Sequence, residues 1–262
     1  MPEGDTVWLT ARRLDVALAG HTVVRGELRV PQHSTAQMAG RRVNEVVSRG
    51  KHLLLRFDDH TTLHTHLRMD GAWHLYGARD RWRGGPDWQV RALLVTSTRA
   101  AVGYRLPVVQ LMATADEAEV VGHLGPDLLG EDWDETSALR RLMLDPQRPI
   151  GEALLDQRVM AGLGNLYRTE LCFIVGVTPW TPVADVATLS RVPGLAHRLL
   201  MVNRDGPSQV TTGRSRRGQE HWVYRRRACL RCTTPVRRSM QGAATQQRVT
   251  YWCPSCQQGP VG

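Results

Sequence analysis

Four cysteines near the end of this 262-residue chain constrain its fold more than any other feature. They form two C-x-x-C pairs, Cys229 with Cys232 and Cys253 with Cys256, separated by twenty residues. Each pair lets two thiolates bind one ion from a tight turn, and two such turns complete a tetrahedral site. Disulfides are disfavoured because we see no secretion leader, and a redox C-x-x-C motif does not occur as a spaced pair. The spacing therefore predicts one structural Zn²⁺ ion.

The zinc ion is expected to hold a basic β-hairpin together. The segments Pro235–Ser239 and Arg248–Trp252, between the cysteine pairs, have the composition of two short strands. They carry Arg237, Arg238 and Arg248. The fifth cysteine, Cys172, lies in an apolar run and is expected in the core.

Positive charge is concentrated in the same part of the chain. The formal net charge is +9, and residues 206–262 contain ten arginines and one acid, which gives +9 in that segment alone (10 − 1). A solvated basic face would account for the total charge, but such a concentrated block favours a polyanion as partner. We expect the partner to be DNA.

One lysine stands out among the basic residues. Of the 34 basic side chains, 33 are arginine, and Lys51 is the exception. Arginine stays charged at any working pH, whereas the pKa of a lysine amine can be tuned for proton transfer. Chance is the alternative, but we interpret Lys51 as a functional residue.

Periodicity predicts a β-rich first part and a helical second part. A helix over Asp5–Leu18 is expected, with Asp5 or Thr6 as its cap. Strands are predicted over Val43–Val47, Leu53–Phe57, Thr61–Met69, Ala72–Tyr76, Ala92–Thr96 and Val108–Met112. Helices are predicted over Ser137–Met143, Ile150–Gln157, Leu163–Val175, Ala184–Ser190 and Leu195–Val202.

Composition divides the chain into three expected domains. They span residues 1–122 (β-sandwich), 123–222 (helical) and 223–262 (four-cysteine zinc ribbon). The chain has no run of eighteen apolar residues, so we expect no membrane partner and a soluble, cytoplasmic, nucleoid-associated bacterial protein that acts as a monomer.

Two further features, a glycine-containing turn and the second residue, are informative only together with the motifs described above. The turn Ala161–Asn165 contains two glycines before a helix, and Asn165 at the helix start suits the binding of a DNA phosphate. Pro2 becomes a secondary amine once Met1 is removed, and such an amine is a nucleophile when it is neutral. A proline in second place is usually without function, so Pro2 alone would not support this interpretation.

Taken together, these motifs resemble the formamidopyrimidine-DNA glycosylase and endonuclease VIII family. The resemblance spans nearly the whole chain and is carried in order by Met1–Thr6, Ser48–His52, Leu155–Gln157, Ala161–Glu170 and Tyr251–Gln257. It implies an α+β fold with an N-terminal β-sandwich, a helix–two-turn–helix domain and a zinc ribbon. The chemistry then needs no cofactor.

The resemblance also implies roles for individual residues. Pro2 would be the nucleophile and Glu3 the general acid, Lys51 would contact phosphate and transfer protons, and Arg248 would act in the elimination. Asn165 and Arg248 would bind the phosphates around a flipped nucleotide. Met69 and Leu67 would fill the hole left in the duplex, and Arg168 is a weaker DNA-binding candidate, because a helix ion pair is the commoner role of such a residue.

The expected activity is that of a bifunctional DNA glycosylase and AP lyase. It would remove oxidised pyrimidines from damaged duplex, single-stranded or bubble DNA and cut the strand by β,δ-elimination. An 8-oxoguanine glycosylase is the enzymatic alternative, because the loop His66–Gly71 is similar to that branch. A non-catalytic zinc-ribbon protein that binds damaged DNA is the other alternative. Thr6 stands where many members have a glutamate that supports the proline amine, which puts the tuning of Pro2 in question.

Overall fold

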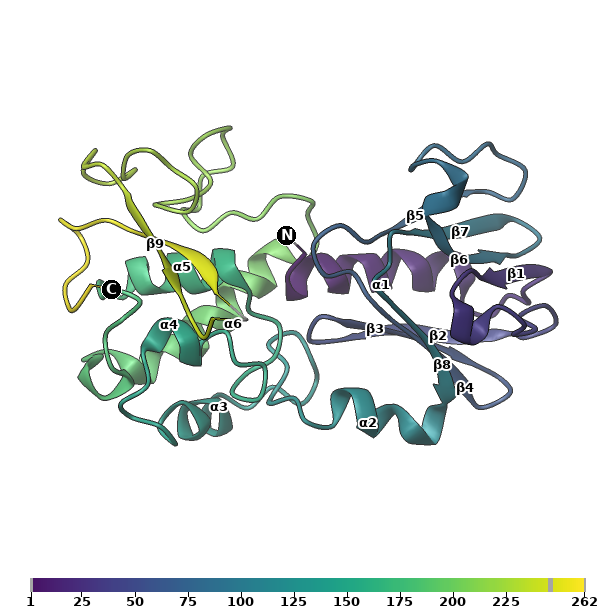
Figure 1. The fold of residues 1–262 in the computed structure, drawn as a ribbon, viewed down its shortest axis with the longest axis horizontal. Helices are drawn as coiled ribbons and strands as arrows, with labels where there is room; N and C mark the ends of the chain where they lie inside the picture. The colour runs from purple at the N-terminus through teal and green to yellow at the C-terminus, as the bar shows by residue number, and fades with distance from the viewer. Residues whose placement is uncertain (1, 245–246, 262) are drawn as a thin grey trace. The chain divides into compact units, whose positions relative to one another are not determined.

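The chain folds into two compact units, residues 1–123 and 124–262 (Figure 1). The structure is a computed structural model that describes residues 2–244 and 247–261. Met1 lies outside the described residues. The further division at residue 222 stays a prediction. Within the described chain, no helix has both the length and the apolar character needed to cross a bilayer.

Unit 1 is a β-sandwich flanked by a helix. One sheet has the order β1-β6-β7-β5 and the other β2-β3-β4-β8, and all neighbouring strands are antiparallel. The elements are α1 (Gly4–Leu18), β1 (Arg25–Leu28), β2 (Val43–Arg49), β3 (His52–Phe57), β4 (Thr61–His66), β5 (Ala72–Gly77), β6 (Val90–Val95), β7 (Arg99–Tyr104), β8 (Val108–Ala113) and α2 (Glu117–Val121). Two short 3₁₀ turns, η1 (Pro31–His33) and η2 (Asp87–Gln89), lie in the loops, and η3 (Thr114–Asp116) leads into α2.

The core of unit 1 lies between the two sheets and α1. Helix α1 contributes an apolar face at positions 7, 11, 14 and 18, the spacing of an amphipathic helix. Alternate residues of β3, such as Leu53, Leu55 and Phe57, meet this face. Because the opposite face of β3 is polar at His52 and Arg56, the second sheet presents a polar outer surface.

Helix α1 begins one residue earlier than the sequence predicted. Its N-cap is Glu3, which makes no side-chain capping bond, so the expected cap at Asp5 or Thr6 is wrong. Asp5 lies in the first turn, where its carboxylate accepts the Thr6 backbone N–H at 2.7 Å. A carboxylate at this position still interacts favourably with the positive end of the helix dipole.

Unit 2 combines short helices with a two-stranded hairpin. Its helices are α3 (Glu135–Leu142), α4 (Ile150–Ala153), α5 (Asn165–Ile174) and α6 (Val192–Asn203), and its strands are β9 (Arg237–Gln241) and β10 (Arg248–Trp252). The apolar sides of these helices form a second core around α5. Cys172 is fully buried there, as predicted.

The differences from the predicted elements have local causes. Strands β1 and β7 were not predicted, because Arg25–Leu28 and Arg99–Tyr104 contain few large apolar residues. Helix α2 was not predicted either. The helix predicted over Ala184–Ser190 is wrong. Two 3₁₀ turns, η4 (Val183–Asp185) and η5 (Leu189–Arg191), lie there instead, and the extended backbone of Val186 interrupts them. The predicted hairpin is confirmed, with its first strand two residues further along.

Candidate functional site

The chain start is held against the first turn of α1. Pro2 is half-buried, and Glu3 is 0% exposed, with extended backbone. The Glu3 carbonyl accepts the Val7 N–H at 3.0 Å, which fixes residue 3 to the helix. The sequence therefore places the Pro2 nitrogen and a buried carboxyl on adjacent residues at the positive end of a helix dipole.

Lys51 lies in the tight turn that joins β2 to β3. Arg49 pairs with His52, so Gly50 and Lys51 form a two-residue loop. Gly50 has φ +57°, the left-handed value that the first central residue of a type II′ hairpin turn requires. A short turn at the end of two paired strands holds the lysine backbone firmly and leaves its side chain half-buried.

Next to Lys51, four histidines form a cluster on the outer face of the second sheet. His52 Nδ1 lies 2.9 Å from His64 Nε2, and the two rings stack with centroids 5.0 Å apart. His66 and His123 meet the His52 ring edge-on at 5.0 and 6.4 Å. His64 and His66 alternate along β4 and therefore lie on one face of the sheet. The alternation of β3 would have placed His52 on the same face.

Burial keeps His52, His64 and His66 neutral. It lowers the pKa of His52 to about 3, with added repulsion from His66 and His64, and the pKa of His66 to about 4, with added repulsion from Lys51. Burial also lowers the pKa of His64. The two imidazoles that interact with Lys51, those of His52 and His66, are therefore uncharged at neutral pH.

The loop between β4 and β5 presents one of its two predicted DNA-filling residues. Met69 is 57% exposed, whereas Leu67 is 3% exposed and belongs to the core of unit 1. The loop is closed by the Gly71 N–H, which donates to the Leu67 carbonyl at 2.9 Å. The expectation for Leu67 is therefore corrected, because its side chain is already packed inside the protein.

Arg105 supports this loop and was not singled out from the sequence. It lies in the turn after β7 with φ +48°. Its Nε donates to the Asp70 carbonyl at 3.1 Å, and its Nη1 donates to Gln89 Oε1 at 2.5 Å. One guanidinium thus ties the Met69 loop to the segment that precedes β6.

In unit 2, the glycine-containing turn before α5 is held by Gln157. The Gln157 side chain donates to the Leu163 carbonyl at 3.0 Å and accepts the Gly162 N–H at 3.1 Å. Gly162 has φ +113°, which a side chain would strain. The N-cap of α5 is Gly164, so Asn165 is the first helical residue rather than the cap.

Asn165 and Arg248 lie close together because a buried network joins α5 to the hairpin. Asn165 Nδ2 donates to the Val249 carbonyl at 2.8 Å, next to Arg248 in β10. Arg168, which is 0% exposed, donates to Gln241 Oε1 at 2.6 Å, to Thr250 Oγ1 at 2.7 Å and to Asn165 Oδ1. The Arg168 guanidinium therefore contacts protein oxygens, whereas Arg248 is exposed.

Glu170, on the same helix, anchors the segment that precedes the cysteines. Its carboxylate accepts the backbone N–H groups of Trp222, Val223 and Tyr224 at 2.7, 2.9 and 2.8 Å. It also accepts the Thr211 hydroxyl. Three backbone donors are a strong anchor for one carboxylate. Side chains of α5 thus position both the hairpin and the start of the ribbon.

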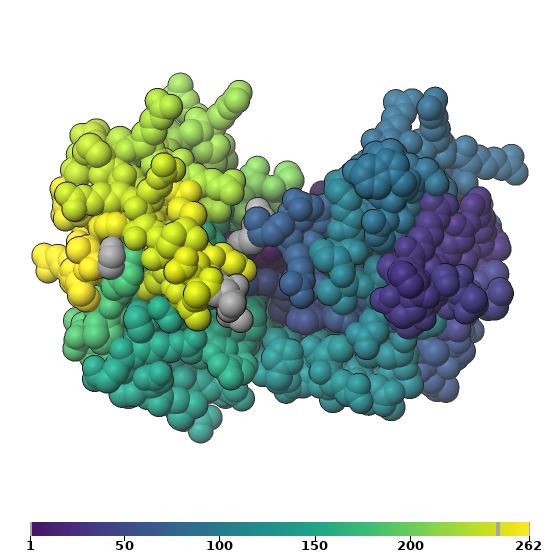
Figure 2. Space-filling view, viewed as in Figure 1, coloured from purple at the N-terminus to yellow at the C-terminus, as the bar shows by residue number. Residues whose placement is uncertain are grey.

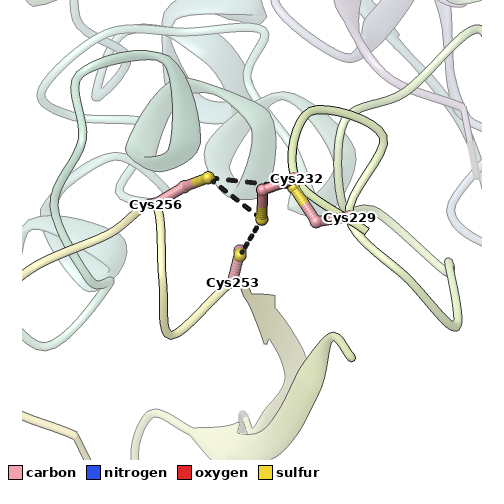
Figure 3. Close-up of side chains that lie close together, drawn as sticks. All are labelled: Cys229, Cys232, Cys253 and Cys256. Atoms are coloured by element: carbon pink, nitrogen blue, oxygen red, sulfur yellow. Dashed lines mark hydrogen bonds between the residues drawn. The ribbon is translucent and has the colours of Figure 1, made fainter. Parts of the chain in front are cut away.

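The four C-terminal cysteines converge on one point (Figure 3). Their Sγ atoms all lie within 4.8 Å of one another, with Cys232 at 3.5 Å from Cys253 and 3.4 Å from Cys256. Two sulfurs bound to one tetrahedral zinc ion lie about 3.8 Å apart, so the donor set fits that ion. A hydrogen bond with Thr234 lowers the pKa of Cys232 to about 6, while burial raises that of Cys256 to about 12.

Arginines surround the cysteine cluster and the hairpin. The exposed ones include Arg237 and Arg238 on β9 and Arg248 on β10. Arg231, between the first two knuckle cysteines, lies over the Phe173 ring at 4.5 Å and the Trp222 ring at 5.2 Å. The Trp222 ring therefore packs within this stack. The positive charge of this region lies on a well-packed surface.

Two family models cover most of the chain. Residues 1–104 match the formamidopyrimidine-DNA glycosylase N-terminal domain, and residues 124–202 match the formamidopyrimidine-DNA glycosylase H2TH domain. The matches fall in units 1 and 2 respectively. The cysteine ribbon lies outside both matched segments.

Full-length relatives show the same relationship. The chain is 54% identical to a protein named probable endonuclease 8 2 of Streptomyces coelicolor, over 100% of this chain and 95% of the relative. It is 42% identical to the DNA-(apurinic or apyrimidinic site) lyase Nei2 of Mycolicibacterium smegmatis, over 98% and 99%. A Lactococcus lactis formamidopyrimidine-DNA glycosylase bound to abasic-site DNA has the same fold, with a TM-score of 0.80 at 22% identity, covering 98% of this chain and all of the other.

Proposed function

Because the chain belongs to the formamidopyrimidine-DNA glycosylase and endonuclease 8 family of DNA-repair enzymes, we propose that its DNA glycosylase and AP lyase activity uses Pro2 as the covalent nucleophile. The observation that carries this proposal is the pairing of Pro2 with the fully buried Glu3 at the start of α1. The partial positive charge of the helix start disfavours a protonated amine, which favours the neutral, nucleophilic form once Met1 has been removed.

The chemistry follows from an amine and a carboxyl on adjacent residues. The Pro2 nitrogen attacks C1′, and the damaged base leaves with the electrons of its glycosidic bond and the proton that the amine gives up. Glu3 donates a proton to the deoxyribose ring oxygen as the C1′–O bond breaks and the sugar ring opens. A secondary amine gives a cationic iminium, which is an electron sink for loss of the C2′ proton. β-Elimination then expels the 3′ phosphate, and δ-elimination expels the 5′ phosphate.

Lys51 and the hairpin residues are assigned to the phosphates. Lys51 lies next to the neutral imidazoles of His52 and His66, and its amine is suited to a phosphate contact and to proton transfer. Arg248 is exposed next to the segment that Asn165 holds, which supports a phosphate contact by Arg248. Arg168 is proposed to position Asn165 and the strand that carries Arg248, and not to contact DNA itself.

The four cysteines are proposed to hold one structural zinc ion. The ion would supply no step of the reaction and would fix the two knuckles that support the hairpin. The sulfur geometry supports this proposal, since four thiol groups within 4.8 Å of one another are a closed tetrahedral donor set. We propose that the protein acts as a monomer.

Oxidised pyrimidines are the proposed substrates. This preference rests on the relatives named endonuclease 8 and on the absence of the Asp-Pro-Arg-Arg-Phe-Gly signature of the 8-oxoguanine branch from this chain. Excision should be measured on thymine glycol and on 8-oxoguanine opposite cytosine, with borohydride present to reduce the iminium. We expect a trapped adduct mainly with thymine glycol, and none with Pro2→Gly. Undiminished trapping by Pro2→Gly contradicts the nucleophile assignment, and a preference for 8-oxoguanine contradicts the lesion assignment.

A further inference from the structure

The β5–β6 connection carries an exposed tryptophan and three exposed arginines. It runs from Ala78 to Gln89 and contains Trp82, Trp88 and the side chains of Arg79, Arg81 and Arg83. Trp88 lies in η2 and is 71% exposed. Figure 2 shows this segment, in blue at the upper right, projecting from the rest of unit 1.

The exposure of Trp88 is not a sign of a loosely folded loop. Trp82, six residues earlier, packs on a small apolar cluster with Val90 and Tyr104 on the outer face of the first sheet. Gly84 approaches the Tyr104 ring so closely that a Cβ there would lie 2.5 Å from it. The same loop therefore buries one tryptophan and leaves the other in solvent.

Three arginines fix the backbone around Trp88. Arg91 Nη1 donates to the Trp88 carbonyl at 2.8 Å, and Arg29 Nη1 forms an ion pair with Asp87 at 2.9 Å. On the other side, Arg105 binds Gln89 Oε1 at 2.5 Å. The backbone that carries the ring is thus held in place, so the segment loses little backbone entropy when the ring binds a ligand.

The same arrangement connects Trp88 to the Met69 loop. Arg105 donates both to Gln89, the neighbour of Trp88, and to the Asp70 carbonyl, the neighbour of Met69. The charged residues of segment 79–91 are four arginines and two aspartates, a surplus of two positive charges (4 − 2). An exposed aromatic ring in a segment with surplus positive charge matches a nucleobase with its phosphate, because every base has a π-face and every phosphate a negative charge.

We propose that Trp88 is a stacking platform for an unpaired base of the DNA strand, with Arg79, Arg81 and Arg83 binding the adjacent phosphates. This inference rests on the proposed function, because that function places DNA at the neighbouring Met69 loop. It predicts that the protein acts well on lesions flanked by unpaired nucleotides, as in bubble or single-stranded DNA. A paired base is already stacked on its neighbours and gains little from the tryptophan ring.

The test separates this surface from the catalytic chemistry. Anisotropy titrations at fixed salt would use an undamaged, labelled single strand and the matching duplex. Trp88→Ala should weaken single-strand binding at least about five-fold, the lower limit for one stacked base, and should affect the duplex less. Trp88→Phe keeps a ring and should stay within about two-fold of the wild-type protein. Leu144→Ala removes an apolar side chain that is 82% exposed in unit 2 and serves as the matched control.

Excision supplies the second readout. The ratio of borohydride trapping on a bubble lesion to trapping on a duplex lesion should fall in Trp88→Ala. Unchanged single-strand affinity, or an equal loss on single strand and duplex, would overturn the proposal. Because the binding assay needs no chemistry, failure of the Pro2 mechanism would abolish trapping on every DNA and leave the difference in single-strand affinity intact.

Discussion

At the residue scale, the side chains to which the family resemblance points fall into two groups. Some are exposed to solvent, and the others are buried and support the exposed ones. Arg248 and Met69 are exposed, whereas Arg168, Glu170 and Leu67 are buried. The sequence identified all of these positions but could not separate the two groups. Whether an arginine contacts DNA or a glutamine side chain depends on how α5 packs against β10. Thr250 of β10, which Arg168 contacts, lies 82 residues further along the sequence.

Replacing Arg168 should therefore damage the fold, and replacing Arg248 should damage DNA binding. Arg168→Ala leaves the oxygens of Gln241 and Thr250 without this donor in the interior, so the free energy of unfolding should fall by about 3 kcal/mol or more. Arg248→Ala removes an exposed cation and should change that free energy by less than about 0.5 kcal/mol while weakening DNA affinity. Urea unfolding and filter binding measure the two effects. Normal stability together with weak DNA binding in Arg168→Ala would show direct contact instead.

At the element scale, strands with large apolar side chains were predictable and those with small ones were not. Runs such as Leu53–Phe57 have a clear alternation, and the structure confirms them as β3. β7 has the sequence Arg99-Ala-Ala-Val-Gly-Tyr104. Its small residues are buried between neighbouring strands, and exposed and buried positions do not alternate along it. The histidine cluster arises at the same scale, because it depends on the register that places His52 opposite His66.

Acid should destabilise unit 1 through this cluster. The pKa values of His52 and His66 in the folded chain, about 3 and about 4, lie below the value of about 6.5 for an unfolded histidine. Between pH 6.5 and 4 the unfolded chain therefore binds more protons, and stability falls as the pH falls, by up to about 1.4 kcal/mol per pH unit for each histidine. Lys51 and Arg68 face the cluster and add repulsion, and Glu117 acts on His64 in the opposite direction.

Thermal unfolding at several pH values measures this effect. The slope of melting temperature against pH from 6.5 to 4.5 should be smaller for His52→Gln than for the wild-type protein. His21→Gln replaces an exposed histidine outside the cluster and should keep the wild-type slope. Equal slopes for all three proteins would mean that the cluster does not couple protonation to folding.

At the scale of the whole molecule, each unit has its own core and its own part of the proposed function. Unit 1 contains Pro2, and unit 2 contains the basic hairpin and the cysteine cluster. The cysteine spacing predicted the ribbon well, because metal-ligand geometry is local and strict. Pro2 was the opposite case, since one residue carries no pattern and gained meaning only from the motifs that follow it.

Metal removal should affect unit 2 and spare unit 1. We expect one zinc ion per chain to be released by a mercurial reagent, with loss of DNA binding as the hairpin loses its support. Cys253→Ser should bind zinc poorly, whereas Cys172→Ala, which changes a buried thiol outside the cluster, should retain the ion. The absence of stoichiometric zinc from freshly purified wild-type protein would contradict the assignment of the cysteine cluster.

The central claim is that the Pro2 nitrogen forms the covalent bond to the sugar. The direct measurement is peptide mass mapping of the borohydride-reduced adduct formed with thymine-glycol DNA. Our account predicts that the deoxyribose remnant is found on the N-terminal peptide, on the nitrogen of Pro2, in chains that have lost Met1. A remnant on the peptide that contains Lys51, or an adduct of equal yield on chains that retain Met1, would contradict it.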